Sequence, residues 1–419
     1  MAINMSRYSG AQGLVGLIGY ESLPSGTRHQ MHWFIAQDGG ESRGLLYARG
    51  GEKGVVLITH PRASFLKHYA VPYLLESGHA VFVLECRYLN NDTNCIHERL
   101  MFDIAAAVKF LRGEGYASVV SFGNSGGGSL LAMYQSQAET APPGRLTDTP
   151  AGDPCDLNEA DLPPFDGAII IGAHLGEGLF MMEQIDPSVV DENNPALTDN
   201  SLDMYNPANG YRGPEQSATY SKDFIQRYRA AQRDRVARLD ALAHAHIAQQ
   251  QLMARGAEGS AFEDRTRFLQ QSILGRTMVI YRTEADLRAC DLSIEPSRRN
   301  MGSMESIRPE ITNYADIGHA RIMSARGWLS TWSGLSSRAG LPMTLPAITV
   351  PTLFIFYAGD NGIFPSAAGL CLSAAKMKDR SDHTLDLDHC GREMDAGQGI
   401  GGREKVKAII GPWLEERFS

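Results

Sequence analysis

Two kinds of hydrophobic pattern divide the chain. Near its start, apolar and polar residues alternate over 32–36 and 44–48, with a polar, Gly-containing turn between them. This alternation predicts an antiparallel pair of strands at the edge of a sheet. The apolar runs that follow are continuous, as expected of strands whose two faces are both covered by helices. These runs occupy residues 55–59, 80–84, 119–122, 168–171 and 352–357.

Helical patterns separate the continuous runs. Apolar residues recur at intervals of three and four, which is the spacing of one helix face. The predicted helices cover residues 65–77 and 96–112 and the segment after Ser125, and the chain ends in a helix near 366–378, a strand over 383–387 and a helix over 403–418. Strands that alternate with helices predict an α/β fold, a mostly parallel doubly wound sheet with right-handed crossovers.

This alternation is interrupted once, by about 180 residues between the runs 168–171 and 352–357. We therefore expect a long, largely helical lid inserted after the sixth strand, with residues 1–172 and 345–419 as the core and 173–344 as the lid. A long helix is predicted from Ser221, a good N-cap, to Gly256. We favour packing of its apolar stripe against the main domain and leave a homodimer contact open. The stripe comprises Ile225, Tyr228, Val236, Leu239, Ala243 and Ile247.

Charge and cysteine content narrow the class of protein. The formal net charge of −9 argues against nucleic acid or an anionic membrane as the main partner. Residues 1–20 lack the basic start and apolar segment of a secretory signal, and no stretch has the ~18–20 apolar residues of a membrane span. The six cysteines lack CxxC pairing, so we expect reduced thiols and no zinc site. A cytoplasmic enzyme without a metal or organic cofactor is the expectation.

A candidate nucleophile lies in the sequence Gly-Asn-Ser-Gly-Gly at 123–127. A strand runs into it and a helix follows, and a serine at the tip of such a turn presents its hydroxyl to solvent. Gly123 and Gly127 allow the strand and helix to approach closely. The amide of Gly126, at the helix N-terminus, then points to where an oxyanion would form. The alternative is an ordinary Gly-rich turn with no catalytic role.

A serine nucleophile needs a base and a group that orients the base. His389 is the best-placed base, because it follows the strand 383–387 on a loop before the last helix. Asp360 leaves the strand 352–357 at the same predicted edge, although Asp-Asn-Gly is also a turn-forming sequence. The alternative acids are Glu177, Asp186 and Asp388.

The loop after strand 55–59 is expected to supply a second oxyanion donor. Pro61 has no N–H, so the donor would be the amide of Arg62 or, as a weaker alternative, Ala63. The Arg62 side chain would either hold a substrate carboxylate or lie exposed at the surface. We assign substrate contacts to His60, which also braces this loop, and to Trp328 and Trp332 of the Met- and Trp-containing lid.

These motifs resemble those of α/β-hydrolase-fold serine hydrolases, akin to bacterial esterases and dienelactone-hydrolase-like enzymes. The resemblance covers about residues 43–140, 166–172 and 350–418, with the 123–127 turn, the His60-Pro61 loop and the chain order nucleophile, acid, base. It implies a catalytic triad of Ser125, Asp360 and His389, with the amides of Gly126 and Arg62 as oxyanion hole. The family's loop often reads His-Gly, whereas a proline stands second here.

The function expected from these residues is hydrolysis of a carboxylic ester through an acyl-enzyme on Ser125. Lactones and thioesters share this tetrahedral chemistry, and the lid composition indicates a medium-sized apolar or aromatic small-molecule substrate. Two alternative functions are left open for this sequence. An acyltransferase would keep water away from the acyl-enzyme, and a non-catalytic ligand-binding protein would need no complete triad.

Overall fold

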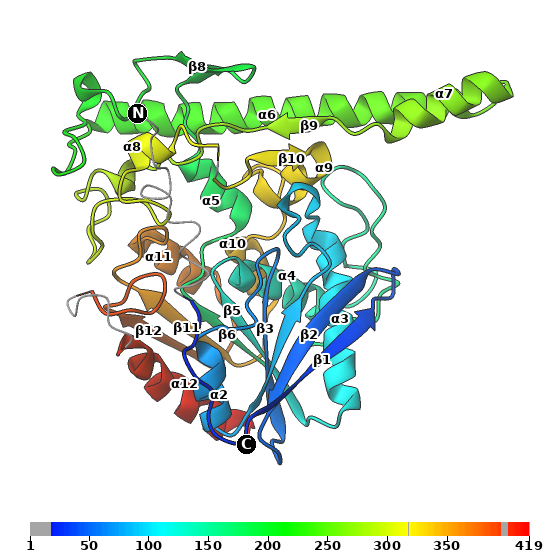
Figure 1. Cartoon of the computed structure of the whole chain (residues 1–419), viewed down its shortest axis with the longest axis vertical. Helices are drawn as coiled ribbons and strands as arrows, with labels where there is room; N and C mark the ends of the chain where they lie inside the picture. The colour runs from blue at the N-terminus through cyan, green and yellow to red at the C-terminus, as the bar shows by residue number, and fades with distance from the viewer. Residues whose placement is uncertain (1–17, 317, 395–400, 419) are drawn as a thin grey trace.

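An eight-stranded sheet forms the centre of the computed structural model, which describes residues 18–316, 318–394 and 401–418 (Figure 1). Most of the segment considered above for a secretory signal, residues 1–17, therefore lies outside the described residues. The strand order is β1-β2-β4-β3-β5-β6-β11-β12, antiparallel between β1, β2 and β4 and parallel from β4 to β12. The strands are β1 (Arg28–Ile35), β2 (Glu41–Ala48), β3 (Gly54–His60), β4 (Ala80–Glu85), β5 (Ser118–Asn124), β6 (Gly167–Ile171), β11 (Thr352–Tyr357) and β12 (Arg380–Leu385).

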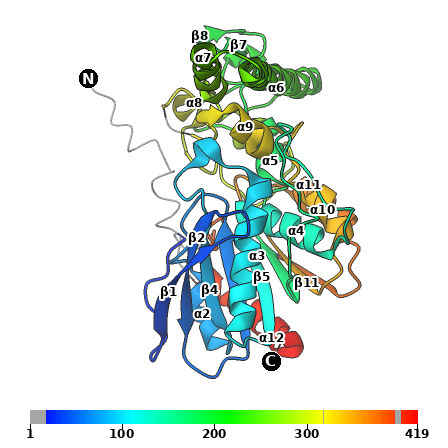
Figure 2. The same cartoon turned by 90° about the vertical axis from the view of Figure 1, so that its right-hand side faces the viewer.

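Helices cover both faces of this sheet (Figure 2). On β3, Val55 and Leu57 pack in the core that contains α3 (His97–Gly113) and α4 (Gly126–Glu139). The alternate residues Val56 and Ile58 pack on the other face, in the core that contains α2 (Ala70–Glu76) and α12 (Gly402–Phe418). Because both faces are covered, β3 and β5 are buried along their whole length. The predicted fold class, a doubly wound sheet of the α/β-hydrolase type, is confirmed.

Two predicted boundaries are wrong for identifiable reasons. The helix predicted over 65–77 begins only at Ala70. A start at residue 65 would place Pro72 in the helix interior, where its missing N–H would break a hydrogen bond, whereas the first turn tolerates it. Strand β12 begins at Arg380, before the predicted residue 383, because an exposed edge strand accepts polar residues that hide its start.

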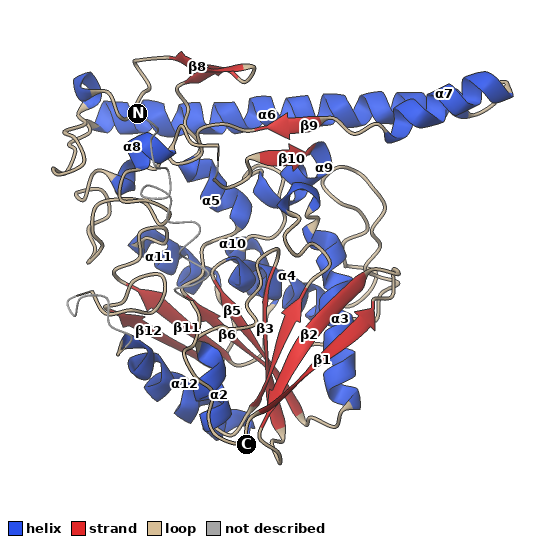
Figure 3. Cartoon of the chain, in the orientation of Figure 1, coloured by secondary structure: helices blue, strands red, loops and turns tan. Residues whose placement is uncertain are grey.

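The segment between β6 and β11 forms an insertion that lies at one end of the molecule (Figures 1 and 3). Helices α6 and α7 form an antiparallel hairpin whose tip projects past the rest of the chain (Figure 1). Long irregular segments and two short antiparallel strand pairs accompany the predicted helices. The main elements are α5 (Glu177–Gln184), β7 (Val189–Asp191), β8 (Asn194–Thr198), α6 (Lys222–Ala257), α7 (Phe262–Ile273), β9 (Thr277–Val279), α8 (Pro309–Thr312), β10 (Ile322–Ser324), α9 (Ala325–Gly327), a π-helical turn (Trp328–Trp332) and α10 (Leu341–Thr344).

Helix α6 starts as predicted, with the Ser221 hydroxyl accepting the Phe224 amide at 3.1 Å. Its apolar face packs on α5, α9 and the π-helical turn, so the expected packing against the main domain is replaced by packing within the insertion. No helix in the described residues combines the length and the apolar character that a bilayer span requires.

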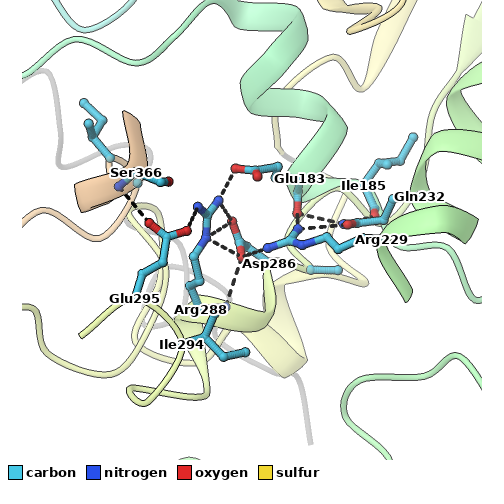
Figure 4. Close-up of polar contacts among 12 residues, drawn as sticks. Glu183, Ile185, Arg229, Gln232, Asp286, Arg288, Ile294, Glu295 and Ser366 are labelled. Carbon is cyan, nitrogen blue, oxygen red and sulfur yellow. Dashed lines mark hydrogen bonds and ion pairs between the residues drawn. The ribbon is translucent and has the colours of Figure 1, made fainter. Parts of the chain in front are cut away.

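A partly buried network of charges joins the insertion to α11 (Pro365–Ala374) (Figure 4). Arg288 contacts Glu183, Asp286 at 3.0 Å and Glu295 at 2.9 Å. The other carboxylate oxygen of Glu295 accepts the Ser366 amide at 2.9 Å. These contacts anchor the insertion to the N-terminal end of α11, a few residues after Asp360.

Replacing Asp240 by alanine is expected to destabilise the insertion. The buried carboxylate accepts hydrogen bonds from Trp328 Nε1 at 2.7 Å, Ser333 Oγ at 2.8 Å and Ser336 Oγ at 2.7 Å. Removing it leaves buried donors unpaired, so the free energy of unfolding should fall by about 3 kcal/mol in a denaturant titration. Asp234→Ala, at an exposed position on the same helix, is the control and should change stability by less than ~0.5 kcal/mol. Equal effects of the two variants would contradict this account.

Candidate active site

Ser125 lies at a sharp turn between β5 and α4, where its backbone has φ 54° and ψ −128°. Such a conformation is strained for a residue with a Cβ, and it turns the side chain away from both elements. A Cβ on Gly127 would overlap the carbonyl oxygen of Thr59, and one on Gly123 would overlap the backbone of Gly128. The two glycines predicted to permit close approach are therefore required by the packing.

The carboxyl ends of β11 and β12 bring two further side chains to Ser125. His389 Nε2 lies 3.2 Å from Ser125 Oγ, and His389 Nδ1 lies 2.7 Å from Asp360 Oδ2. The second oxygen of Asp360 accepts the amides of Gly362 at 2.7 Å and Ile363 at 3.1 Å. Asp360 therefore has both of the roles considered for it: it shapes its own loop and it binds the imidazole of His389.

The charge on Asp360 decides the protonation behaviour of His389. Burial lowers the pKa of this imidazole, but the charge of Asp360 and the hydrogen bond to it outweigh burial and leave the pKa above 6.5. A carboxylate that stabilises an imidazolium in this way suits a histidine that accepts a proton from a serine hydroxyl.

The alternative acids have other partners. Asp388 accepts the amides of Cys390 and Arg392, each at 2.9 Å, and shapes the loop that carries His389. Asp186 accepts from Arg282 Nε at 3.0 Å, inside the insertion. Glu177 pairs with Arg62. Of the four candidate acids, Asp360 alone has a hydrogen bond to His389 in the described part of the chain.

A cavity of about 260 Å³ lies beside Ser125 and His389. Its wall combines apolar residues such as Phe65 and Met304 with an unusual number of ionisable side chains. The ionisable ones besides His389 are His60, Arg62, Asp92, Glu305 and His319. The last three were missed at the sequence level, because they lie in irregular segments that carry no motif or periodicity.

His60 lines this cavity as predicted, and its ring is neutral. Nδ1 accepts the amide of Ala63 at 3.1 Å and lies 3.4 Å from the amide of Arg62. Burial and then the Arg62 charge hold the pKa of His60 well below 6.5. The Arg62 amide therefore faces the His60 ring at the long end of hydrogen-bond distance, and its role as second oxyanion donor stays a prediction. Gly126 begins α4, so its amide has no partner within that helix.

The Arg62 side chain is mostly buried, and its charge is already paired with carboxylates of the protein, so neither role considered for it holds. Its guanidinium contacts the buried carboxylate of Glu177, lies 3.4 Å from Asp92 and stacks on the Trp332 ring at 4.5 Å. The pair holds the pKa of Glu177 well below its usual range despite burial. A Cβ on residue 126 would overlap Glu177 Oε1 and would lie 3.0 Å from His60 Nε2, which explains why this position is a glycine. A buried ion pair therefore packs directly against the Ser125 turn.

Neither tryptophan lines the cavity, in contrast to the prediction. Trp328 and Trp332 are both 0% exposed. Trp328 donates to Asp240 at 2.7 Å, and Trp332 donates to Asp92 at 3.1 Å and lies under Arg62. Each indole N–H has found an acceptor in the protein, so these side chains are part of the packed interior. These two tryptophans therefore do not support the expected apolar or aromatic substrate, whereas Met304 of the same insertion does line the cavity.

A larger cavity of about 500 Å³ lies between the insertion and α11. It is lined by Phe180 and Gly362 but by neither Ser125 nor His389. The Phe180 ring packs edge-on at 5.3 Å against His319, which lines the smaller cavity, so Phe180 contributes to the wall between the two. The larger cavity is therefore not the candidate active site. The hydrogen-bonded Ser125 and His389 lie at the smaller cavity.

Comparison with solved structures finds similar chains at low identity. An esterase domain from Rhodothermus marinus is 11% identical, with 94% of this chain and 100% of that chain covered and a TM-score of 0.42. The Pyrococcus furiosus esterase Pf2001 is 10% identical, with 94% and 92% covered and a TM-score of 0.43. The α/β hydrolase GrgF from Penicillium sp. sh18 is 11% identical, with 93% and 99% covered and a TM-score of 0.49. No protein-family model and no curated protein sequence matches this chain.

The pair of Arg62 and Glu177 generates a stability prediction. Arg62→Met leaves an ionised carboxylate buried without its main partner, which should lower the free energy of unfolding by about 3–5 kcal/mol. Glu177→Leu should also destabilise, because the guanidinium loses one of its two carboxylates. The double variant Arg62→Met/Glu177→Leu should lose less than the sum of the two single variants, as measured in a double-mutant cycle by denaturant unfolding. Strict additivity would show that the two side chains do not act as a pair.

Proposed function

We propose that the protein is a serine hydrolase that cleaves a carboxylic ester through an acyl-enzyme on Ser125. The observation that carries this proposal is the hydrogen-bonded chain from Ser125 through His389 to Asp360. It combines a nucleophile on a strained turn, a base within reach and a buried acid that holds the base.

The mechanism follows from these positions. His389 Nε2 accepts the hydroxyl proton as Ser125 Oγ attacks the ester carbonyl, and Asp360 stabilises the imidazolium that forms. The Gly126 amide donates to the developing oxyanion at the N-terminus of α4. His389 then protonates the leaving alcohol, and water activated by the same imidazole releases the acid. Lactones and thioesters pass through the same intermediates. The cavity of about 260 Å³ favours a small substrate.

Replacing Ser125 by alanine tests the nucleophile. Turnover of p-nitrophenyl butyrate should fall by about 10⁴- to 10⁶-fold, since no other group in the chain of hydrogen bonds attacks the carbonyl. A fluorophosphonate should label the wild-type protein at Ser125, as read by peptide mass spectrometry. Ser129→Ala, which removes the next serine on α4, should keep both the activity and the label. Turnover that survives in Ser125→Ala would refute the assignment, and analysis of products with added alcohol would reveal acyl transfer.

The pH profile tests the base. His389 accepts a proton only when it is neutral, so kcat/KM should fall as pH decreases through its pKa, with a midpoint above 6.5. Asp360→Asn removes the charge that raises this pKa. The midpoint should therefore move to lower pH, while kcat falls by roughly 10⁴-fold. An unchanged midpoint in Asp360→Asn would show that another group controls the acid limb.

A further inference from the structure

A second pair of charged side chains lines the cavity beside Ser125. Glu305 and His319 both come from an irregular part of the insertion, and His319 Nε2 lies 3.0 Å from Glu305 Oε1. Both are largely buried, with 12% of the Glu305 side chain and 20% of the His319 side chain exposed. The insertion therefore adds charges of both signs to a cavity whose nucleophile comes from the sheet.

Each of the two side chains shifts the pKa of the other toward its charged form. Burial lowers the pKa of His319, but contact with Glu305 outweighs burial and leaves it above 6.5. Burial raises the pKa of Glu305, but His319 outweighs that effect and leaves it below 4.5. Glu305 is therefore a carboxylate at neutral pH, and His319 lies against one of its oxygens.

One oxygen of this carboxylate has no partner. Oε1 contacts His319, whereas Oε2 is buried and accepts no hydrogen bond from any described residue. Leaving an ionised oxygen without a donor is costly, so such an atom in a cavity wall marks a place where a ligand can supply the donor.

Two other carboxylates of the described chain have an unpartnered buried oxygen, and neither shares this setting. Burial raises the pKa of Glu98 to about 7, so this carboxyl is only about half ionised at neutral pH. Glu310 contacts Arg308 through its other oxygen. Neither lines the cavity beside Ser125, whereas Glu305 does.

We propose that Glu305 is a specificity residue whose Oε2 accepts a hydrogen bond from a hydroxyl or ammonium group of the substrate. The proposal rests on the ester hydrolase function and names its substrate class: small esters with a hydrogen-bond donor close to the scissile carbonyl. A substrate carboxylate would be repelled by Glu305, and Arg62 is already neutralised by Glu177 and Asp92. His319 acts as a positioning residue that fixes the Glu305 carboxylate.

Matched esters test this inference. p-Nitrophenyl butyrate has no hydrogen-bond donor. The p-nitrophenyl esters of 3-hydroxybutyrate and 3-aminobutyrate differ from it only by a hydroxyl or an ammonium group on carbon 3. In the wild type, kcat/KM for a donor-bearing ester should exceed that for butyrate by about tenfold or more, as expected of a hydrogen bond to a charged group. Glu305→Leu should bring that ratio to about one, because the hydrogen bond that favours the donor-bearing ester is lost.

Two further variants separate recognition from folding. Glu305→Gln keeps the volume and an acceptor oxygen but removes the charge, so it should lose the preference for ammonium more fully than the preference for hydroxyl. Glu310→Gln alters a carboxylate outside this cavity and should leave both ratios unchanged. If Glu305→Leu does not fold, as judged by circular dichroism, the ratios in Glu305→Gln decide.

Three results would overturn the inference. Equal kcat/KM for all three esters in the wild type would exclude recognition of a donor while leaving the hydrolase function intact. Equal losses on all three esters in the Glu305 variants would assign Glu305 a structural role only. If the wild type hydrolyses none of the esters, or if turnover survives in Ser125→Ala, the proposed function fails and this inference fails with it.

Discussion

The structure depends on one constraint, the strained backbone of Ser125 at the junction of β5 and α4. A positive φ at a residue with a Cβ persists only where the surrounding packing enforces it. Here Gly123 and Gly127 supply the close contacts that bring α4 against β3 and β5, because no other residue fits at either position. The same close packing places the start of α4, with its unpaired amides, beside the serine hydroxyl. The candidate nucleophile and the candidate oxyanion site are consequences of one turn.

Charge pairing is the second constraint, since half of the described residues that line the small cavity are ionisable. Burying an ion costs several kcal/mol unless a partner compensates it. Arg62 is compensated by Glu177 and Asp92, and His389 by Asp360. Glu305 is compensated by His319 through one oxygen only. Glu305 Oε2 has neither a hydrogen bond nor an ion pair among the described residues, and it indicates where a substrate would add to the network.

Residues at the ends of regular strands could be placed from the sequence, whereas residues in irregular segments could not. The positions of Ser125, Asp360 and His389 could be inferred, because parallel strands carry their carboxyl ends to one edge whatever the loops contain. Glu305 and His319 could not, because their proximity depends on an irregular segment with no period of its own. The tryptophans were misassigned since an aromatic residue in a Met-containing insertion fits a core or a pocket equally well. Only the indole acceptors, the buried Asp240 and the partly exposed Asp92, decide between the two.

The contacts of the insertion also bear on how a substrate enters. Separating the insertion from the core as one body would break the Arg62 and Glu177 pair and expose both charges. It would also part Ser330 from Glu98, a hydrogen bond of 2.6 Å, and Arg326 from Asp153, an ion pair of 2.6 Å. At the far side it would release the Ser366 amide from Glu295. The irregular segment that carries Glu305 and His319 is itself tied to the core, because Asn361 Nδ2 donates to the carbonyl oxygens of Asn300 at 3.1 Å and Gly302 at 2.9 Å. Displacement of the insertion as one body therefore carries a large cost, since several buried charges would lose their partners at once.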